Sequence, residues 1–467
     1  MTSLESSSSD DSQTDNKLQG YSHALLYALK AAGVQFLRYH SVDAYNNPRV
    51  KSAPLLAILS MSTSSATRLD QYPVAMASVC VAGLPSHADA MQTASGLDAR
   101  GTLLLEPDLQ TLTVLPYAPT SAIVLGCWRE QSSSRISDLC CRSLLKSIVQ
   151  KQSSTIGFSV GAELEFTLMD RQTHRPVDAS RFAHSELLNT QQEFLDDLYN
   201  QLTQQNIAVE LIHAESAPGQ VEVVLRYCRD PAQLVDQVVL ARETISHLAR
   251  KHGMKALFLP KIDANQAGNG CHLHIGLFDP QTGQSIFGAE QQRGLSDTAQ
   301  HFVEGILQHL SALVALTLPT ANSFRRVGPG CWTGSSVVYS YDDKEAPLRL
   351  VEEPLMGAPS PGVSHVEYKL CDSTANLYLA LAGILASGLE GISTKATLRP
   401  HRYSAPSQTE QSLPETIGQA LSLLEQDALL KTTIPPALMN AYVAIRRSEA
   451  ERASGMTLEE EVQEALL

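Results

Sequence analysis

Residues 160–168 read VGAELEFTL, and this stretch sets the pattern on which the rest of the 467-residue chain is interpreted. Side chains alternate between the two faces of a strand, so every second residue from Val160 to Leu168 is apolar, while Glu163 and Glu165 share the opposite face. Two ionised carboxylates that close repel each other unless a cation or a basic group lies between them. The stretch therefore predicts a strand with one apolar face and one metal-binding face. For an isolated E-x-E, an ordinary solvated face is the alternative.

Three later segments repeat this design. In HAESAPGQVEVVL, Glu215 precedes a Pro-Gly turn and Glu222 lies in a Val-rich strand, while HVEYKL puts Glu367 on a polar face. The glycine turn of AGNGCHLHIGL leads into a strand on which His272 and His274 share a face. Five glutamates and a histidine form an oxygen-rich donor set, which suits Mg²⁺ or Mn²⁺ better than a thiolate-seeking metal. The sequence therefore predicts a site for two metal ions.

These segments, in this order, resemble the glutamine synthetase superfamily. That family builds one catalytic funnel from an E-x-E strand, an E-x-x-P-G-Q-x-E segment, a glycine turn leading into H-x-H, an N-S-[YF]-x-R loop and an E-x-[RK] strand. The chain carries ELE, ESAPGQVE, GNGCHLH, NSFRR and EYK, from Gly161 to a helix ending near Ile392, with a weaker N-terminal echo. A Trp-Thr-Gly sequence, KEAPLR and EYK look most similar to the branch of fungal developmental proteins and plant nodulin fusions.

The resemblance implies two divalent ions, held by six residues in two groups. The group near the amino acid substrate would be Glu165, Glu215 and Glu222, and the group near the ATP phosphates would be Glu163, His272 and Glu367. Other residues would contact the substrates directly. His274 would approach the nucleotide, Gly268 would let the backbone near the substrate amino group, and Arg326 would bind the substrate α-carboxylate.

The resemblance also implies the reaction. ATP would first phosphorylate the γ-carboxylate of glutamate, and an amine would then displace phosphate from the acyl phosphate. Arg349 and Lys344 would neutralise the transferring phosphate, and Lys369 completes the expected catalytic set. Metal ions and guanidinium groups offset charge in such a transition state, and positioning supplies a further large share.

The chain departs from the family pattern around the amine. Family members that use ammonia carry a flap glutamate six residues beyond the loop arginine, and here that position is Trp332. An indole cannot neutralise a cation by charge, although its face can bind an organic amine through a cation–π contact. The family's F-D-G-S-S motif is missing from GLPSHADAM (83–91), where Asp89 is a weak substitute. Lysines also replace arginines at Lys344 and Lys369, which changes the available hydrogen-bond geometry.

Plainer interpretations of three residues stay open. His274 could pack in a barrel layer, and Arg326 could be a surface charge in a basic loop. Trp332, in a Gly-rich loop, could pack at a subunit contact rather than line an amine pocket.

The length of the chain predicts two domains. We expect a disordered tail over 1–17, a small β-grasp-like domain over 18–150 and a catalytic domain over 151–467. The fold class is α+β, with the larger domain built on an antiparallel half-barrel sheet backed by helices. Sequence patterns predict helices at 20–33, 298–318, 374–391 and 434–448, a helix opened by Asp230-Pro231, and two strands around an Asn-Asn-Pro turn.

The composition of the chain limits which partners and which cellular compartment are expected. A net charge of −14 argues against binding nucleic acid, because phosphate backbones attract basic surfaces. No apolar run reaches the roughly 20 residues that span a bilayer, and the Ser- and Asp-rich start has no signal-peptide core, so a cytoplasmic protein with no membrane contact is expected. The eight cysteines are expected to be reduced. Self-association into a ring, a decamer or dodecamer, is implied by the resemblance alone.

The function predicted from the sequence is an ATP-dependent γ-glutamyl ligase whose acceptor is an amine larger than ammonia. The alternatives are glutamine synthesis from ammonia, a non-catalytic scaffold or signalling protein, and a carboxylate kinase whose acyl phosphate meets another nucleophile. The sequence leaves the amine, the acid substrate and the number of subunits open.

Overall fold

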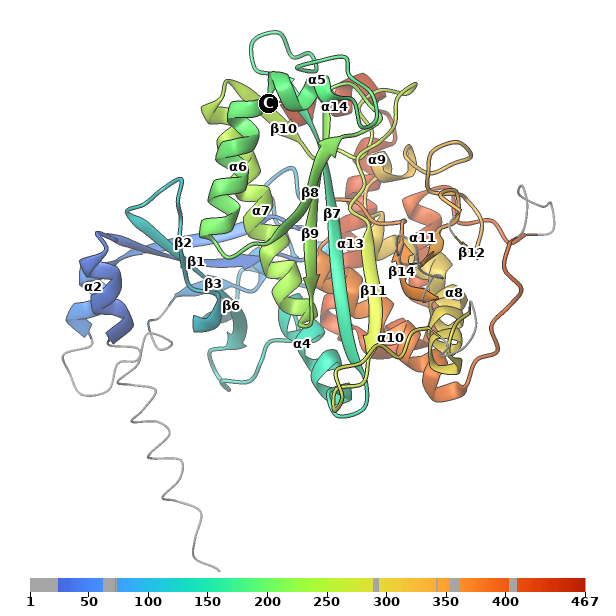
Figure 1. The fold of residues 1–467 in the computed structure, drawn as a ribbon. Coiled ribbons are helices and arrows are strands. Elements are labelled where there is room, and N and C mark those ends of the chain that lie inside the picture. Colours follow the sequence, from blue (N-terminus) through green and yellow to red (C-terminus); the bar gives the residue numbers. More distant parts are fainter. Residues whose placement is uncertain are drawn as a thin grey trace, which may run out of the picture. The chain divides into compact units, whose positions relative to one another are not determined.

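The computed structural model describes residues 24–61, 72, 74–288, 294–341, 343–352, 362–402 and 410–466 (Figure 1). The described residues form two compact units. One takes residues from 1–41, 48–77 and 101–137, and the other from 42–47, 78–100 and 138–467. The domain ranges expected from the sequence stay a prediction, and the expected tail over 1–17 lies outside the described residues.

The first unit is a six-stranded sheet with the strand order β2-β1-β6-β4-β3, and β5 pairs with β6. β1 (Phe36–Val42) runs parallel to β6 (Ser121–Glu130), while β4 (Thr102–Pro107) runs antiparallel to β6 and to β3 (Ala75–Ala77). The other elements are β2 (Pro48–Pro54), β5 (Thr113–Val114) and α2 (Leu55–Met61). The predicted pair of strands around the Asn-Asn-Pro turn is confirmed as β1 and β2, and the predicted first helix is confirmed over its described part, 24–31.

The second unit contains an eight-stranded curled sheet with the order β12-β13-β14-β11-β7-β9-β8, and β10 pairs with β7. All described pairings are antiparallel except that of β12 with β13. The strands are β7 (Gly157–Asp170), β8 (Val209–Ala214), β9 (Gln220–Cys228), β10 (Met254–Leu257), β11 (Leu273–Phe278), β12 (Tyr339–Tyr341), β13 (Leu348–Glu352) and β14 (Val363–Tyr368). Figure 1 shows β7, β9 and β11 side by side, and the predicted α+β class is confirmed.

Helices back this sheet. The longer ones are α4 (Cys141–Gln152), α6 (Gln192–Gln204), α7 (Pro231–Lys251), α8 (Asp297–Thr317), α10 (Leu377–Thr394), α11 (Ile417–Gln426) and α13 (Pro436–Ala453). The shorter ones are α3 (Val79–Ala82), α5 (Ser185–Thr190), α9 (Ala321–Phe324), α12 (Ala428–Thr433) and α14 (Leu458–Leu466). The Asp230 side chain accepts hydrogen bonds from the amides of Ala232 and Gln233, which confirms the predicted start of α7. α8, α10 and α13 confirm the other predicted helices, whereas α6, α11, α12 and α14 were not predicted.

Helices α8 and α10 approach each other closely. A Cβ atom on Gly391 would lie 2.1 Å from the carbonyl oxygen of His301 and 2.7 Å from the backbone of Gly305, so only glycine allows this approach. Within the described residues, α10 is the one helix long and apolar enough to cross a membrane, judged by length and composition alone. Because 72% of that helix is buried inside the protein, the similarity to a membrane span is weak evidence for one.

An ion-pair triad joins three of these helices around His309 of α8. Its Nε2 lies 2.6 Å from Oε2 of Glu390 on α10, and its Nδ1 lies 2.7 Å from Oδ2 of Asp427, which caps α12. Burial alone would lower the pKa of His309, but the hydrogen bonds with Asp427 and Glu390 outweigh it and raise the pKa above the ordinary value.

We predict that replacing His309 with Gln destabilises the fold more at about pH 6 than at about pH 8.5. The folded pKa is raised, so the triad contributes fully below the unfolded histidine pKa of about 6.5 and loses its contribution as pH rises through the folded value. The expected difference between the two pH values is about 0.5–1 kcal/mol, because part of the triad is open to solvent. Urea unfolding at both pH values measures it, with His301→Gln as the control, since His301 of α8 bonds the Ala396 carbonyl instead. An H309Q penalty that is the same at both pH values would contradict the prediction.

Candidate active site

Strand register brings the predicted metal ligands to one face of the second sheet. Glu165 of β7 lies opposite Glu222 of β9, and His274 of β11 lies opposite Glu367 of β14. On the far side of β9, His213 of β8 also lies opposite Glu222. Directly paired residues in antiparallel strands have neighbouring side chains, so residues far apart in the sequence meet at this face.

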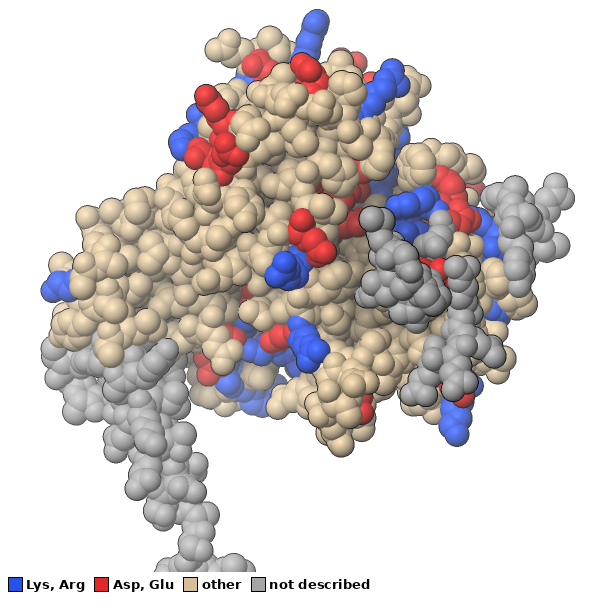
Figure 2. All heavy atoms as spheres, in the orientation of Figure 1, with Lys and Arg blue, Asp and Glu red and all other residues tan. Residues whose placement is uncertain are grey.

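These side chains line a cavity of about 600 Å³. Most of the residues predicted from the sequence are among its lining residues: Glu163, Glu165, Glu215, Glu222, Gly268, His272, His274, Arg326, Trp332, Lys344, Glu367 and Lys369. Figure 2 shows acidic and basic side chains lying next to one another over the region where β7 and β9 run in Figure 1. Arg349 is not one of the described residues that line this cavity.

One group of potential ligands is the predicted set at the phosphate end. Glu163, His272 and Glu367 offer ligand atoms that all lie within 4.8 Å of one another. Nδ1 of His272 is 2.9 Å from Oε2 of Glu163 and 3.3 Å from Oε1 of Glu367. Burial acts to raise the pKa of Glu163, but the hydrogen bonds from His272 and His274 hold that pKa well below its usual range.

The second group differs in one member from the predicted set. His213, Glu215 and Glu222 have ligand atoms within 4.8 Å of one another, and His213 was not predicted. His213 precedes Glu215 by two residues, so strand alternation puts both on one face, and that signal was present in the sequence. Glu165 lies between the two groups, since it is paired with Glu222 across β7 and β9 and its Oε1 is 3.7 Å from Nε2 of His272. Its other oxygen, Oε2, accepts hydrogen bonds from the amide of Gly270 at 2.9 Å and from Gln220 at 3.0 Å.

Glu222 is the carboxylate on which the repulsion from neighbouring carboxylates acts most clearly. Burial, followed by repulsion from the four carboxylates of Glu163, Glu165, Glu215 and Glu367, raises the pKa of Glu222 to about 10. A buried carboxylate in this environment is stable only when it is protonated or next to a cation. A divalent ion bound by oxygen and imidazole ligands would relieve this repulsion, so the residues present fit Mg²⁺ or Mn²⁺.

Basic side chains hold Glu367 in place. Nζ of Lys369 donates to Oε1 at 3.0 Å, and the Arg349 side chain donates to Oε2. Although burial opposes it, the bond from His272 and the charge of Lys369 hold the pKa of Glu367 well below its usual range. Arg349 therefore contacts a potential metal ligand, while Lys344 is exposed at the cavity.

Arg326 is buried at the inner wall of the cavity. Only 3% of it is exposed, and its Nη2 donates to the carbonyl oxygens of Lys369 at 3.1 Å and Cys371 at 2.9 Å. A Cβ atom on Gly268 would lie 2.6 Å from Cγ of Arg326 and 2.4 Å from the carbonyl oxygen of Pro260. Gly268 therefore allows the close approach of Arg326, a packing role that the sequence did not suggest.

An aromatic cluster lies beside Glu163. Nε2 of His274 is 3.0 Å from Oε1 of Glu163, and its Nδ1 is 2.9 Å from Nε2 of His365. The Tyr227 hydroxyl lies 3.0 Å from the same nitrogen of His365. Burial, with the neighbouring His274, lowers the pKa of His365 to about 3. The sequence analysis missed Tyr227 and His365, although His365 precedes Glu367 by two residues on the same strand face.

Trp332 lies at the cavity in an unusual backbone conformation. Its φ is 62°, a left-handed value that is rare for a bulky residue, and 53% of it is exposed. Both carboxylate oxygens of Glu345 hold this loop, since Oε1 accepts from the amide of Trp332 at 2.8 Å and Oε2 from the amide of Gly330 at 3.0 Å. Such strain persists only where the surroundings impose it, and it is often found at functional sites. Asp89 is exposed and is not among the described residues that line the cavity.

Carboxylate and imidazole donors at one cavity, with buried basic side chains beside them, are typical of metal-dependent enzymes that act on phosphates. A family profile for "Glutamine synthetase, catalytic domain" matches residues 138–465. The chain belongs to this family, whose members are ATP-dependent ligases that use divalent metals and join glutamate to ammonia or an amine.

Similar proteins include enzymes that are named for different products. Glutamine synthetase of Methanocaldococcus jannaschii is 31% identical over 369 residues, covering 74% of this chain and 79% of that protein. The gamma-glutamylpolyamine synthetase GlnA3 of Streptomyces coelicolor is 30% identical over 377 residues, covering 76% of this chain and 78% of that protein. A solved GmaS/ADP complex superposes with a TM-score of 0.79 at 25% identity, covering 93% of this chain and 97% of that one.

We predict that Mn²⁺ binding releases protons and strengthens as pH rises from about 6 to about 8.5. Near neutral pH the ion-free protein keeps Glu222 protonated, because its pKa is raised to about 10, whereas the ion-bound form needs the carboxylate. Titration calorimetry in buffers of different ionisation enthalpy measures both effects. Glu222→Gln should weaken binding by roughly 100-fold.

The control for this prediction is Glu210→Gln, since Glu210 is an exposed cavity residue outside both ligand groups. Equal losses in E222Q and E210Q would mean that Mn²⁺ is attracted by the general negative charge of the cavity.

Proposed function

We propose that this protein is an ATP-dependent ligase that joins the γ-carboxylate of glutamate, or of a close analogue, to an amine larger than ammonia. The observation that carries the proposal is a contrast within one cavity. Glu163, His272 and Glu367 offer a donor set for metal and phosphate, whereas Trp332 puts an exposed indole at the position where the family resemblance implies a glutamate in members that use ammonia.

Two ligand groups would hold the metal ions: Glu163, His272 and Glu367 in one, and Glu215 and Glu222 with Glu165 or His213 in the other. Bound Mg²⁺ or Mn²⁺ would supply charge neutralisation for phosphoryl transfer from ATP. Lys344 is exposed to the cavity and would add positive charge there, while Arg349 and Lys369 would act mainly by orienting Glu367.

Arg326 would bind the α-carboxylate of the acid substrate. A guanidinium fixed by two backbone carbonyls presents its remaining donors in a defined direction, which suits recognition of a carboxylate. His274 and Tyr227, which form the aromatic cluster near Glu163, would lie against the nucleotide.

The exposed surface of the cavity supports an organic acceptor. Besides Tyr227, three large apolar or aromatic side chains line the cavity and are strongly exposed: Phe182 at 62%, Leu211 at 60% and Trp332 at 53%. Exposed aromatic surface at a cavity favours an amine with a carbon chain, because the chain gains apolar contacts and the ammonium gains cation–π contacts. The name of the relative GlnA3, a gamma-glutamylpolyamine synthetase, agrees with such an acceptor.

Glutamine synthesis from ammonia is the second candidate, supported by relatives that are named glutamine synthetase. A carboxylate near the flap position would favour it, and Glu345 lies there. Both oxygens of Glu345, however, accept hydrogen bonds from loop amides, which favours a structural role over ammonium binding.

Assembly and location are part of the proposal. The family resemblance supports a closed ring of subunits, a decamer or dodecamer, in the cytoplasm. Size-exclusion chromatography with light scattering would measure the subunit number directly.

The function is tested by measuring phosphate release and amide product with glutamate, ATP, Mg²⁺ and either ammonia or a panel of methylamine, putrescine and spermidine. We expect kcat/KM for at least one organic amine to exceed that for ammonia by about tenfold or more. Turnover with ammonia alone would contradict the larger-amine proposal. Formation of ADP without an amide would indicate another nucleophile, and no ADP with any acceptor would indicate a scaffold.

We predict that Trp332→Ala lowers kcat/KM for the preferred amine by about fivefold to tenfold, since a cation–π contact contributes about 1 kcal/mol. Trp332→Glu should raise kcat/KM for ammonia relative to the organic amine, because it restores a charge that attracts ammonium. Steady-state kinetics on both acceptors measure the change. Tyr199→Ala is the control, since Tyr199 is 52% exposed on α6 and does not line the cavity. An unchanged ratio in both Trp332 variants would place the indole outside amine recognition.

A further inference from the structure

The C-terminal helix α14 is anchored on the sheet of the second unit. Its Val462 and Leu466 are buried against Met169 of β7 and Leu257 of β10, with Leu458 and Ala465 packed around them. The helix begins with a capping box, in which the Thr457 amide donates to the Glu460 carboxylate at 2.8 Å and the Thr457 hydroxyl accepts from the Glu460 amide at 3.2 Å. The apolar face and the cap fix both the position and the rotation of α14.

This orientation directs Glu461 toward the loop that carries Arg326. Glu461 is only 8% exposed, although it is charged. Its Oε2 accepts from Nδ2 of Asn322 at 2.7 Å and from Nε of Arg325 at 3.0 Å, and its Oε1 accepts from Nη2 of Arg325 at 3.1 Å. Arg325 directly precedes Arg326 in the chain. Glu461 therefore binds the residue next to the proposed carboxylate-binding group.

Asn322 ties the same loop to a second element. Its Oδ1 accepts from the Lys261 amide at 2.7 Å, and its Nδ2 donates to the Lys261 carbonyl at 3.0 Å as well as to Glu461. Both the oxygen and the nitrogen of the Asn322 side-chain amide therefore form hydrogen bonds. Arg325 makes one more bond to the C-terminal segment, from Nη2 to the carbonyl oxygen of Met456 at 3.2 Å.

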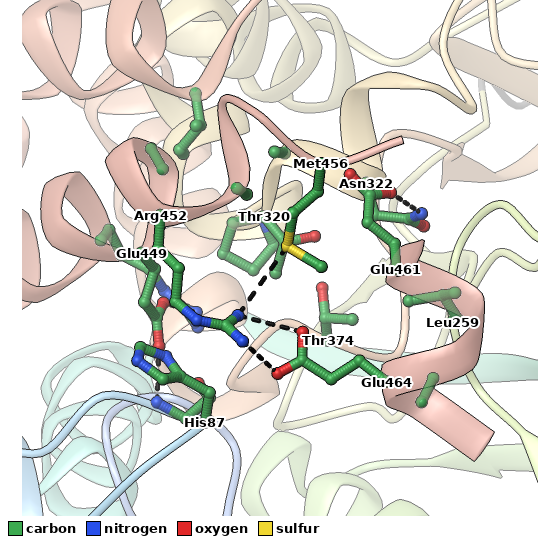
Figure 3. Close-up of a pocket in the computed structure, with 18 residues that line it drawn as sticks. His87, Leu259, Thr320, Asn322, Thr374, Glu449, Arg452, Met456, Glu461 and Glu464 are labelled. Atoms are coloured by element: carbon green, nitrogen blue, oxygen red, sulfur yellow. Dashed lines mark hydrogen bonds and ion pairs between the residues drawn. The ribbon is translucent and has the colours of Figure 1, made fainter. Parts of the chain in front are cut away.

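A cavity of about 440 Å³ separates α13, α14 and the start of α9. Figure 3 shows the Glu461–Asn322 contact on one side of this cavity and the Arg452–Glu464 ion pair on another. Because space remains between these elements, the Glu461 carboxylate bridges α14 and α9 through polar contacts instead of close apolar packing. A bridge made of a few charge-assisted bonds is sensitive to the loss of one carboxylate.

We infer that Glu461 is a positioning residue for the substrate site: α14 acts as a strut that sets the position of α9 and hence of Arg326. This inference rests on the proposed function for its kinetic consequence. Arg326 would bind the α-carboxylate equally in the ground state and in the transition state, so its displacement should raise KM for the acid substrate more than it lowers kcat. A misplacement of about 1 Å is enough to change binding or rate strongly.

The test compares two glutamates of α14. Glu461→Gln keeps the shape of the side chain but removes the charge and sets an amide group against the Arg325 guanidinium. Glu464→Gln is the matched control, because Glu464 forms a bidentate ion pair with Arg452 at 2.6 and 3.0 Å at the surface, so its hydrogen bonds go to α13 and not to α9. We expect E461Q to raise KM for glutamate by about tenfold with kcat within about threefold of wild type, and E464Q to change neither.

A second readout does not depend on activity. Hydrogen–deuterium exchange of the segment 320–328 should be at least about fivefold faster in E461Q than in wild type, and unchanged in E464Q. If the wild-type protein forms no product from glutamate and any amine, the proposed function is wrong. The exchange experiment would still test whether Glu461 positions the segment 320–328. Should E461Q fail to fold, Arg325→Gln breaks the same link from the more exposed partner, whose side chain is 38% exposed. Equal effects of E461Q and E464Q, or no change in exchange in E461Q or R325Q, would overturn the inference.

Discussion

Mutual repulsion among buried carboxylates is the constraint on which this structure depends. Glu163, Glu165, Glu215 and Glu367 surround Glu222 on one face of a sheet, and burial together with their charge raises the pKa of Glu222 to about 10. A fold driven by stability alone would not gather these groups, because each buried unpaired charge costs free energy. The arrangement requires that Glu222 is protonated or that a cation shares the face, and this requirement marks the site.

The scaffold resists this repulsion through the opposite face of the same strands. Val160, Leu164 and Phe166 of β7 are fully buried, and β7 pairs with β9, β11 and β10 along its 14 residues. Shifting a strand by one residue would move its apolar side chains into the cavity, so register is strongly specified. The apolar core thus fixes the positions of the carboxylates, and the site is preorganised before any ligand binds.

Alternation along single strands was enough to predict Glu163, Glu165 and Glu367 at the site, because period two is a local property of the sequence. Features that depend on long-range geometry were not predictable in the same way. Tyr227 is five residues from Glu222, so regular alternation puts it on the other face, but the β7–β9 register shifts between Val160 and Ala162 and the Tyr227 ring reaches the cavity. The contact of Arg349 with Glu367 and that of Glu461 with Arg325 join residues separated by 18 and 136 positions, for which the sequence holds no periodic signal.

Strands and loops both contribute side chains to the cavity, and this difference bears on how the acceptor can change within one family. Most of the potential metal ligands are strand residues whose positions follow from backbone pairing and an apolar core, and Glu215 and His272 lie next to the ends of strands. Trp332, in contrast, lies in a loop held by the Glu345 carboxylate. Under the proposed function, substitutions at the Trp332 loop would change which acceptor the cavity binds and leave the strand carboxylates in place, whereas substitutions on the strands would change charge balance and register together. Phosphoryl transfer and acceptor choice would then be separable in this fold, which agrees with an indole at the position where the family resemblance implies a flap glutamate.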